Sequence, residues 1–266
     1  MMKKATSILM LLAMLATGVQ TAFAQTDSRN YERGWYAGLS GGTSFGQCTF
    51  RSITESKTNV GAQFGVFGGH QFSRLFSVEA LATMGWQKQT SLDCCPFWLA
   101  TDGSFTFAPV LGKQGNYFRD LEAKTHWMRF GLQANFDVLS LLTKPTTRWS
   151  VTLSPQVSAV TTRTKHLATG RSAEGRLQGK NEQEFDRQWH LGLGGQAAVG
   201  YRVAGNVGLQ LYGGITCLTG DRFDNIPKYG HKSNLIYEAG LKVSYHFGKQ
   251  GKAAPVVEAP PCYCRT

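Results

Sequence analysis

The residues with the clearest chemical potential lie near the C-terminal end of the sequence. His231 and Ser233 are two positions apart in a polar segment, and Glu238 follows them. A serine hydroxyl becomes a nucleophile when a histidine removes its proton and a carboxylate orients that histidine. His231, Ser233 and Glu238 are therefore a candidate hydrolytic set. The alternative is a polar loop that is simply solvated.

Ionisable residues also recur within segments of alternating polarity, on the side that carries the polar residues. They are Glu79, Arg129, Arg148, Arg202, Glu238 and Lys242. Because an ionised group buried without a partner costs several kcal/mol, we expect the two glutamates to pair with cations of this set. The candidate partners are Arg129, Arg148 and Lys242. Such a network would fill and rigidify an interior, and the alternative is a charged gate in a small channel.

The chain contains six cysteines. Cys48, Cys94, Cys95 and Cys217 fall in or near predicted loops at one end, where an oxidising compartment admits one or two disulfides. Cys262 and Cys264 lie at the other end and could pair only with each other or with a partner. No Cys/His spacing matches a zinc site, and no phosphate loop or dinucleotide fingerprint occurs. The sequence therefore predicts no metal and no cofactor.

Residues 1–24 have the pattern of a cleaved signal peptide. Met1 to Lys4 is basic, Ile8 to Val19 is apolar, and Ala22-Phe23-Ala24 is a small-x-small cleavage pattern before Gln25. The apolar run is too short for the roughly 20 residues that span a bilayer as a helix. The sequence therefore predicts export of the mature chain.

The net charge of +11 would also suit a nucleic-acid-binding protein. An exported chain rarely meets nucleic acid, and its basic residues are spread along predicted loops instead of forming one stripe. We therefore expect no nucleic-acid partner. The phosphate groups of lipopolysaccharide at a cell surface are the expected electrostatic partner.

Period-two alternation of apolar and polar residues, interrupted by glycines, is the main structural signal. It predicts eight strands, at 34–46, 59–71, 75–88, 124–137, 147–160, 188–202, 206–218 and 234–248. Each is long enough for the roughly 9 to 11 tilted residues with which a β-strand crosses a bilayer.

The predicted connections alternate in length. The long ones are 47–58, 89–123, 161–187 and 219–233, and the shorter ones are 72–74, 138–146 and 203–205, with room for a helical turn in 138–146. This rhythm is typical of outer-membrane barrels, with long loops outside the cell and short turns in the periplasm. An even number of strands would then place both mature termini in the periplasm.

The two faces of the predicted strands differ in composition. One face is aliphatic at its centre and aromatic at its ends, and its aromatic residues are Trp35, Phe45, Trp86, Trp149, Trp189, Tyr201, Tyr237, Tyr245 and Phe247. This is the composition of a lipid-facing band between two interfacial girdles. The other face is polar and is expected to surround a small polar lumen. A soluble lipocalin-type barrel would instead have its apolar face inside.

The segment Gly34-Trp35-Tyr36-Ala37-Gly38-Leu39 and the closing segment Tyr237 to Phe247 carry a family likeness. Over residues 34–248 the chain resembles the OmpA/OmpX-like group of small outer-membrane proteins. The resemblance implies an all-β fold, an eight-stranded antiparallel up-and-down barrel in the outer membrane of a Gram-negative bacterium. The closing segment resembles the signal read by the barrel-assembly machinery, with Gly240, Val243, Tyr245 and Phe247 at its positions.

The flanking segments are assigned by the same resemblance. Residues 25–33 are expected to be a lead-in to the barrel. Residues 249–266 contain a Pro/Ala-rich stretch similar to the hinge that precedes the peptidoglycan-binding domain of OmpA proteins. We expect a periplasmic tail there and no anchoring to peptidoglycan.

Three functions compete. We expect a non-enzymatic structural or surface-interaction protein whose loops meet lipopolysaccharide, host molecules or neighbouring cells, because binding residues of a rigid scaffold usually lie in its loops. Within one loop, Cys94-Cys95-Pro96-Phe97-Trp98 is either a contact surface or a packed loop core. The first alternative is a narrow porin, although eight strands usually leave room only for side chains. The second is a lipid A-modifying enzyme, because His231-Lys232-Ser233-Asn234 resembles the His-x-Ser-Asn pattern of the PagL deacylases.

Overall fold

The computed structural model describes residues 34–54, 57–90, 97–100, 104–142, 148–168, 182–184, 186–204, 206–220, 223 and 234–247. The predicted signal peptide, lead-in and tail lie outside these residues. So do His231, Ser233, Cys94, Cys95, Cys262 and Cys264.

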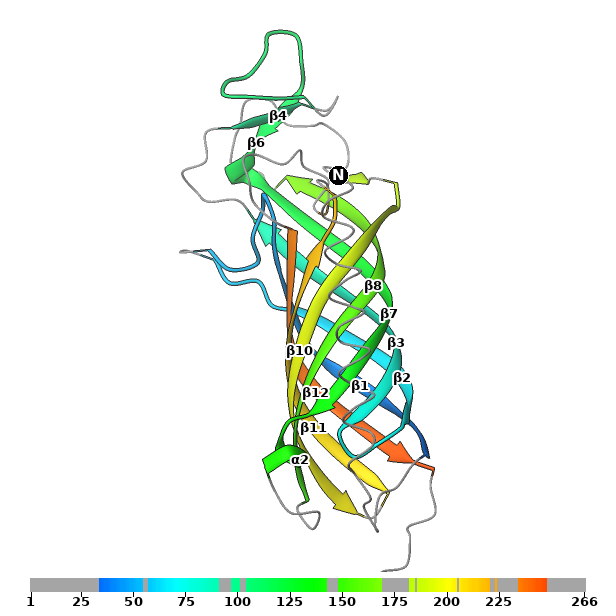
Figure 1. Cartoon of the computed structure of the whole chain (residues 1–266). Helices are drawn as coiled ribbons and strands as arrows, with labels where there is room; N and C mark the ends of the chain where they lie inside the picture. The colour runs from blue at the N-terminus through cyan, green and yellow to red at the C-terminus, as the bar shows by residue number, and fades with distance from the viewer. Residues whose placement is uncertain are drawn as a thin grey trace, which may run out of the picture.

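Eight long strands form a closed antiparallel barrel (Figure 1). They are β1 (Gly34–Gln47), β2 (Gly61–Gln71), β3 (Phe76–Thr90), β7 (Leu121–Asp137), β8 (Trp149–Ala168), β10 (Gln188–Ala204), β11 (Val207–Leu218) and β12 (Asn234–His246). Each pairs with the next along the chain, and β12 pairs with β1 to close the barrel. Closure pairs every sheet edge, which is what a strand needs to cross a bilayer. The predicted fold class is confirmed.

Smaller elements decorate the two ends of the barrel. The sheet of β4 (Trp98–Ala100), β5 (Phe105–Thr106) and β6 (Gly115–Tyr117), followed by the 3-10 turn Phe118–Asp120, lies between β3 and β7. Strand β9 (Glu182–Glu184) pairs with the far end of β8, and helix α2 (Leu139–Leu142) joins β7 to β8 at the opposite end. We call the first end the loop end and the second the turn end. Among the described residues no helix has the length and apolarity to cross a membrane.

Short polar connections build the turn end. Between β2 and β3, the hydroxyl of Ser73 accepts the backbone N–H of Leu75 at 3.3 Å and of Phe76 at 3.1 Å. At the end of β7, a carboxylate oxygen of Asp137 accepts the N–H of Leu139 at 3.1 Å and that of Val151 at 3.2 Å. Asp137 thereby caps α2 and ties it to β8, so the helical turn expected within 138–146 is present.

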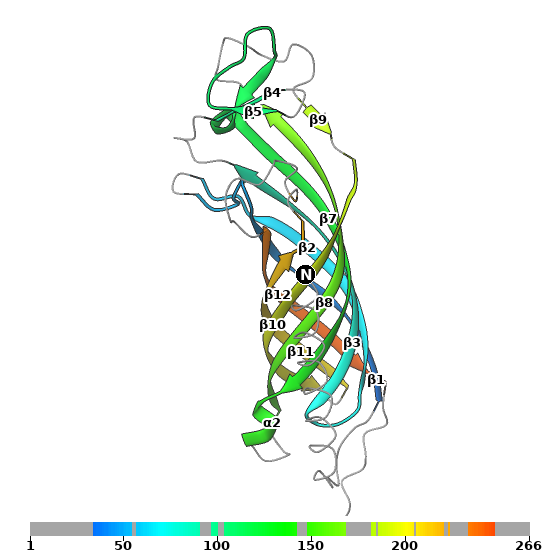
Figure 2. The same ribbon diagram turned by 45° about the horizontal axis from the view of Figure 1, so that its top comes forward.

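The strands of one wall continue beyond the ends that the sequence predicts. The segments 121–123 and 161–168, expected to be loop, extend the ladder of β7 and β8 up to the pair Leu121↔Ala168. The predicted loops 89–123 and 161–187 are therefore too long. The prediction failed because the alternation of apolar and polar residues stops where the wall leaves the lipid. The backbone hydrogen bonds between strands do not need that alternation and continue. Figure 2 shows β7 and β8 rising beyond the other strands.

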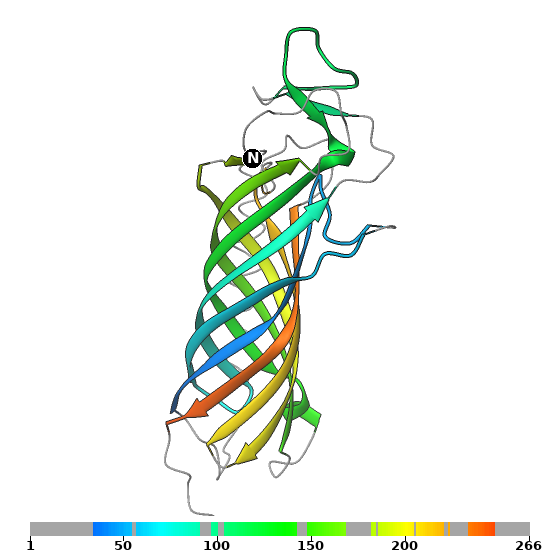
Figure 3. The same ribbon diagram turned by 180° about the vertical axis from the view of Figure 1, so that it is seen from behind.

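Residues alternate between the outside and the inside of the wall as predicted. Leu39, Leu132, Leu153, Leu191 and Leu241 are exposed on the outer surface, whereas Glu79, Arg129, Gln133, Ser154 and Lys242 are buried within the lumen. The distribution is inverted relative to a soluble protein, and in Figure 3 none of the described helices and strands covers the outer wall from behind. Such a surface is stable in lipid and unstable in water.

The lumen departs from the expectation of a polar interior. Toward the loop end it contains an apolar plug of buried side chains: Cys48, Trp127, Val160, Leu218, Phe223 and Ile236. A second apolar cluster joins the small sheet to the rim and contains Phe50, Leu99, Phe118, Leu121 and Ala123. Buried polar side chains, among them Gln87, Gln89 and Thr125, lie around the plug, and the two buried ion pairs lie closer to the turn end.

The outward face allows a direct stability test. Leu132 is exposed midway along β7, paired in register with Ala80 and Val157. We expect Leu132→Arg to lower the free energy of unfolding in phospholipid vesicles by about 2–4 kcal/mol, the cost of a cation near the bilayer midplane. Leu111→Arg, at a fully exposed loop-end position, is the control and should change it little. Urea unfolding followed by tryptophan fluorescence measures both, and equal effects would contradict a lipid-facing wall.

Candidate functional site

A buried ion pair spans the lumen from β7 to β12. The guanidinium of Arg129 faces the carboxylate of Glu238 in a two-pronged contact, in which Nη2 donates to Oε2 at 2.8 Å and Nη1 donates to Oε1. Arg129 is 2% exposed and Glu238 is 4% exposed. The hydroxyl of Thr216 lies 3.3 Å from Nη1 of Arg129 and receives the amide of Gln156 at 2.7 Å. This pair closes the lumen with a matched set of charges.

A second buried pair lies closer to the turn end. Lys242 donates from Nζ to Oε1 of Glu79 at 2.9 Å. The same carboxylate accepts the side-chain amide of Gln133 at 2.8 Å, the hydroxyl of Tyr36 at 3.2 Å and the amide of Asn135 at 3.3 Å. Donors from β1, β7 and β12 thus surround the carboxylate of Glu79, which offsets the desolvation of the two charges. The sequence assigned Glu79, Arg129, Glu238 and Lys242 to one network, and the structure brings them together as two pairs.

Aromatic rings occupy the remaining space around Lys242. Its Nζ lies 5.1 Å from the ring centroid of Phe67 and 5.6 Å from that of Tyr212. The hydroxyl of Tyr212 accepts the amide of Gln63 at 3.0 Å. Phe67, Tyr212 and the two ion pairs thus lie close together in the middle of the lumen.

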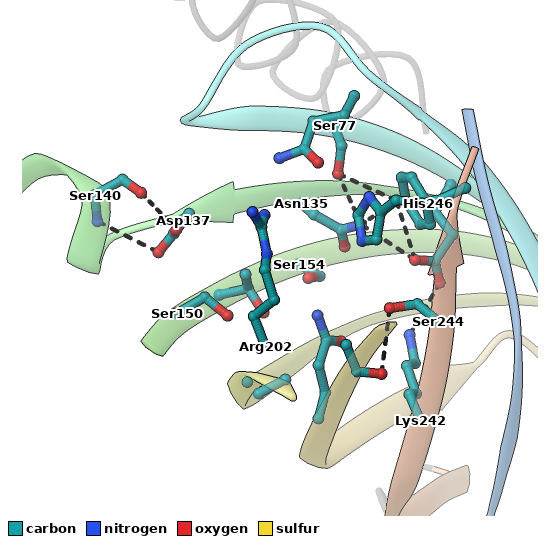
Figure 4. A pocket seen from close by; sticks show the side chains of 18 of the residues that line it. Ser77, Asn135, Asp137, Ser140, Ser150, Ser154, Arg202, Lys242, Ser244 and His246 are labelled. Carbon is teal, nitrogen blue, oxygen red and sulfur yellow. Dashed lines mark hydrogen bonds and ion pairs between the residues drawn. The ribbon is translucent and has the colours of Figure 1, made fainter. Parts of the chain in front are cut away.

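A cavity opens from the second pair toward the turn end (Figure 4). Its volume is about 680 Å³, and its walls are mostly hydroxyl, amide and charged side chains. Arg148 and Arg202 line this cavity, and the backbone N–H of Arg202 donates to the carbonyl of Arg148 at 2.9 Å. Both arginines are exposed. The structure thus places these two predicted network residues at the mouth, apart from the buried pairs, and of the three candidate partners it is Arg129 and Lys242 that pair with the glutamates.

The candidate hydrolytic set is not supported in the form in which it was predicted. Glu238 points into the lumen, where Arg129 occupies its carboxylate. A carboxylate held there cannot orient a histidine at the lipid-facing surface. His231 and Ser233 lie outside the described residues. Among the described residues no cluster of three or more His, Cys, Asp or Glu side chains is arranged to hold a metal ion.

The two described cysteines lie on opposite sides of the wall. Cys48 is buried in the apolar plug, where its sulfur accepts the amide of Gln89 at 3.1 Å. Cys217 is exposed on the outer face of β11 and forms no disulfide. These two cysteines therefore do not pair with each other. The other predicted cysteine pairs fall on residues outside the description.

The predicted aromatic residues all lie on the outer face, in two groups. Trp35, Trp149, Tyr201, Tyr245 and Phe247 gather toward the turn end, and Phe45, Trp86, Trp189 and Tyr237 toward the loop end. Within the predicted assembly signal, Val243, Tyr245 and Phe247 are likewise exposed outward. Gly240 lies on the inner face, directly opposite Gly42 across the β1–β12 seam.

The loop-end sheet carries an exposed apolar tip that the sequence did not single out. Trp98 is buried and Phe97 packs against Phe118 at 5.8 Å between ring centroids, so the described part of the Cys94–Trp98 segment is a packed loop core. Exposed instead are Phe107, Val110 and Leu111, which we call the apolar tip. The N–H of Lys113 donates to the carbonyl of Val110 at 3.1 Å, and Gly112 has φ of +81°. This tight turn requires the glycine and fixes Leu111 at its apex.

A closed barrel with lipid-facing residues outside and ion pairs inside defines the class of this protein. It is a small eight-stranded outer-membrane β-barrel, and the OmpA/OmpX-like likeness of its sequence is confirmed at the level of the fold. On one side of this barrel, β7 and β8 form a tall wall next to the small sheet.

Comparisons with known proteins add likenesses of fold. No family model matches the chain, and no curated protein does. Neisserial surface protein A is 13% identical, with a TM-score of 0.46, over 80% of this chain and 97% of its own. Ail of Yersinia pestis, the attachment invasion locus protein, is 9% identical, with a TM-score of 0.43, over 81% of this chain and 99% of its own. OprG of Pseudomonas aeruginosa is 11% identical, with a TM-score of 0.36, over 83% and 100%.

Proposed function

We propose that the chain is a surface scaffold: a sealed outer-membrane barrel whose loop end projects outside the cell and presents the apolar tip to an extracellular partner. The observation that carries this proposal is the tip itself. Leu111 and Phe107 are exposed at the end of a sheet that has its own apolar cluster. Apolar side chains held in water by a rigid turn cost free energy unless a partner covers them.

The contents of the lumen favour the scaffold function over the alternative function of a narrow channel. Two buried ion pairs and an apolar plug lie at successive levels of the lumen, which favours an interior that does not conduct ions. We therefore expect the refolded chain to show no discrete openings in planar bilayers at any salt concentration. Stepwise conductance would contradict the proposal of a sealed scaffold and favour that of a channel.

Orientation is tested in intact cells. An epitope inserted near Arg176, between β8 and β10, should be labelled from outside, whereas one appended at the C-terminus should become accessible only after the outer membrane is permeabilised. The opposite pattern would place the loop end in the periplasm and overturn the proposal.

The role of the tip is tested by removing its apolar side chains. We expect Val110→Ser with Leu111→Ser to reduce attachment of expressing cells, to epithelial monolayers or to one another, by tenfold or more. Leu141→Ser with Leu142→Ser is the matched control, because these leucines of α2 are likewise exposed, at the turn end. Attachment that is unchanged in the tip variant, or lost equally in the control, would contradict a binding role for the tip.

A further inference from the structure

The cavity at the turn end has two sides that differ in how their polar groups are used. On the side of β1, β3 and β7 the groups bond one another. The hydroxyl of Tyr36 lies 3.2 Å from that of Ser77, and the amide of Asn135 donates to Ser77 and to Glu79. On the side of β8, β10 and β11, five other side chains line the cavity, here called the open wall: Ser150, Thr152, Ser154, Gln196 and Gln210. Figure 4 shows Ser150 and Ser154 on this side.

The polar groups of the open wall are not used by the protein itself. Their side chains form no hydrogen bond with any residue that the structure describes. Ser154 is 4% exposed and Gln196 is 7% exposed, so both are shielded from bulk solvent. Buried hydroxyls and amides are almost always hydrogen-bonded, and where the protein supplies no partner they bond water or a ligand. The open wall is thus a set of positioned groups with hydrogen bonds to give.

The strand register arranges these groups in two rows. In the inner row, Ser154 lies directly opposite Gln196. In the outer row, nearer the mouth, Ser150 and Gln210 lie on the two sides of Gly200. Four residues of β8 separate the rows, which is roughly 13 Å along a strand. This spacing is longer than one sugar ring and suits two linked rings.

A small side chain between the rows leaves room for a ligand. Ala198 of β10 is the register partner of Thr152 and lines the cavity between the inner and the outer row. The cavity volume of about 680 Å³ lies within the roughly 300–1,000 Å³ of small-molecule sites. The pair of Glu79 and Lys242 closes the inner end, so a ligand enters from the turn end.

The chemistry of the open wall favours a neutral ligand with many hydroxyls. Hydroxyl and carboxamide side chains both donate and accept, as each sugar hydroxyl does, and none of the five is charged. The two acids that line the cavity already accept hydrogen bonds from the protein, Glu79 from Lys242 and Asp137 from the backbone of Leu139. A sugar therefore exchanges its bonds with water for bonds of the same kind with the wall.

We propose that the cavity at the turn end binds a soluble, neutral disaccharide, whose hydroxyls bond the two rows of the open wall. The chain holds the sugar and does not pass it across the membrane, because the ion pairs close the inner end of the cavity. In the orientation proposed above the turn end faces the periplasm, so the sugar is a periplasmic solute. The site does not depend on what the apolar tip binds, and either proposal can fail while the other holds.

The test uses the full chain refolded in micelles of a polyoxyethylene detergent, whose headgroup contains no sugar. Maltose, cellobiose and trehalose are the probes, and we expect saturable transfer of magnetisation from the protein to the protons of at least one of them. Ser154→Ala with Gln196→Leu should bind that sugar about tenfold more weakly, the typical loss for two neutral hydrogen bonds. Ala198→Leu fills the space between the rows and should bind it at least as weakly. Heat-modifiable mobility in gels establishes that each variant is folded.

The matched control is Ser44→Ala with Gln87→Leu. It makes the same two exchanges at buried lumen positions outside the cavity, on the loop-end side of the Glu79–Lys242 pair, and should bind within about twofold of the unchanged chain. Arg148→Gln, at the mouth, should likewise retain binding, and inorganic phosphate should not displace the sugar.

Four results would each overturn the proposal. They are no saturable binding of any of the three sugars, unchanged binding in both open-wall variants, equal losses in the open-wall variants and the control, and displacement by phosphate together with a loss in Arg148→Gln. The last result would identify the cavity as an anion site.

Discussion

Replacing Glu238 by leucine should lower the free energy of unfolding by about 3–5 kcal/mol, because it leaves the guanidinium of Arg129 buried without its counter-charge. Urea unfolding in vesicles measures the loss. The double variant Arg129→Met with Glu238→Leu should recover most of it, since it removes both charges at similar volume. The control is Glu122→Gln, which breaks the partly exposed pair with Lys88 and should cost about 1 kcal/mol or less. A double variant as unstable as the single one would show that the pair is not the cause.

Replacing Gly240 by valine should prevent stable closure of the barrel, at a cost of roughly 3 kcal/mol or more. A Cβ on Gly240 would lie 2.9 Å from Cα of Gly42, and one on Gly42 would lie 2.6 Å from Cα of Gly240. Both clashes are with the backbone of the β1–β12 seam, which cannot move aside without opening its hydrogen bonds. The expected result is a large decrease in the folded, heat-modifiable form.

Gly41→Val is the matched control for the seam. Gly41 neighbours Gly42 on the same strand but faces outward, and a Cβ there meets nothing closer than the carbonyl of Gln63 at 3.9 Å. This variant should fold as the unchanged chain does. Folding of Gly240→Val to the same yield would show that the seam tolerates a wider spacing.

The barrel could be predicted because lipid imposes a simple rule on the wall. Residues such as Leu39 and Leu191 must face outward and Glu79 must face inward, and a period of two in the sequence records this directly. The same rule does not apply above the membrane. There, Thr162 and Thr164 face inward beside Arg163, so the continuing strand resembles a polar loop when only its composition is read.

The site was harder to predict than the wall. The sequence indicates which charged residues face inward. Which of them pair depends on their height along the tilted strands, so the sequence could not tell whether Arg129 or Arg148 pairs with a glutamate. The apolar plug was missed although Trp127 and Ile236 sit on the inward side of their strands. Trp127 and Ile236 both lie near the loop end of their strands, and this shared position is a signal that could have revealed the plug. The exposure of the apolar tip depends on packing within one loop, where the rings of Phe97 and Phe107 lie 4.6 Å apart, yet Phe107 is exposed and Phe97 is half-buried.

The tall wall of β7 and β8 gives the molecule a front and a back. A barrel turns freely about the membrane normal, and a symmetrical rim would look the same to a neighbour at every angle. With the small sheet carried on one side, the tip instead sweeps a circle around the barrel axis as the protein turns (Figure 2). Rotational diffusion thereby increases the area over which the tip of a single copy passes, without any movement of the protein through the lipid.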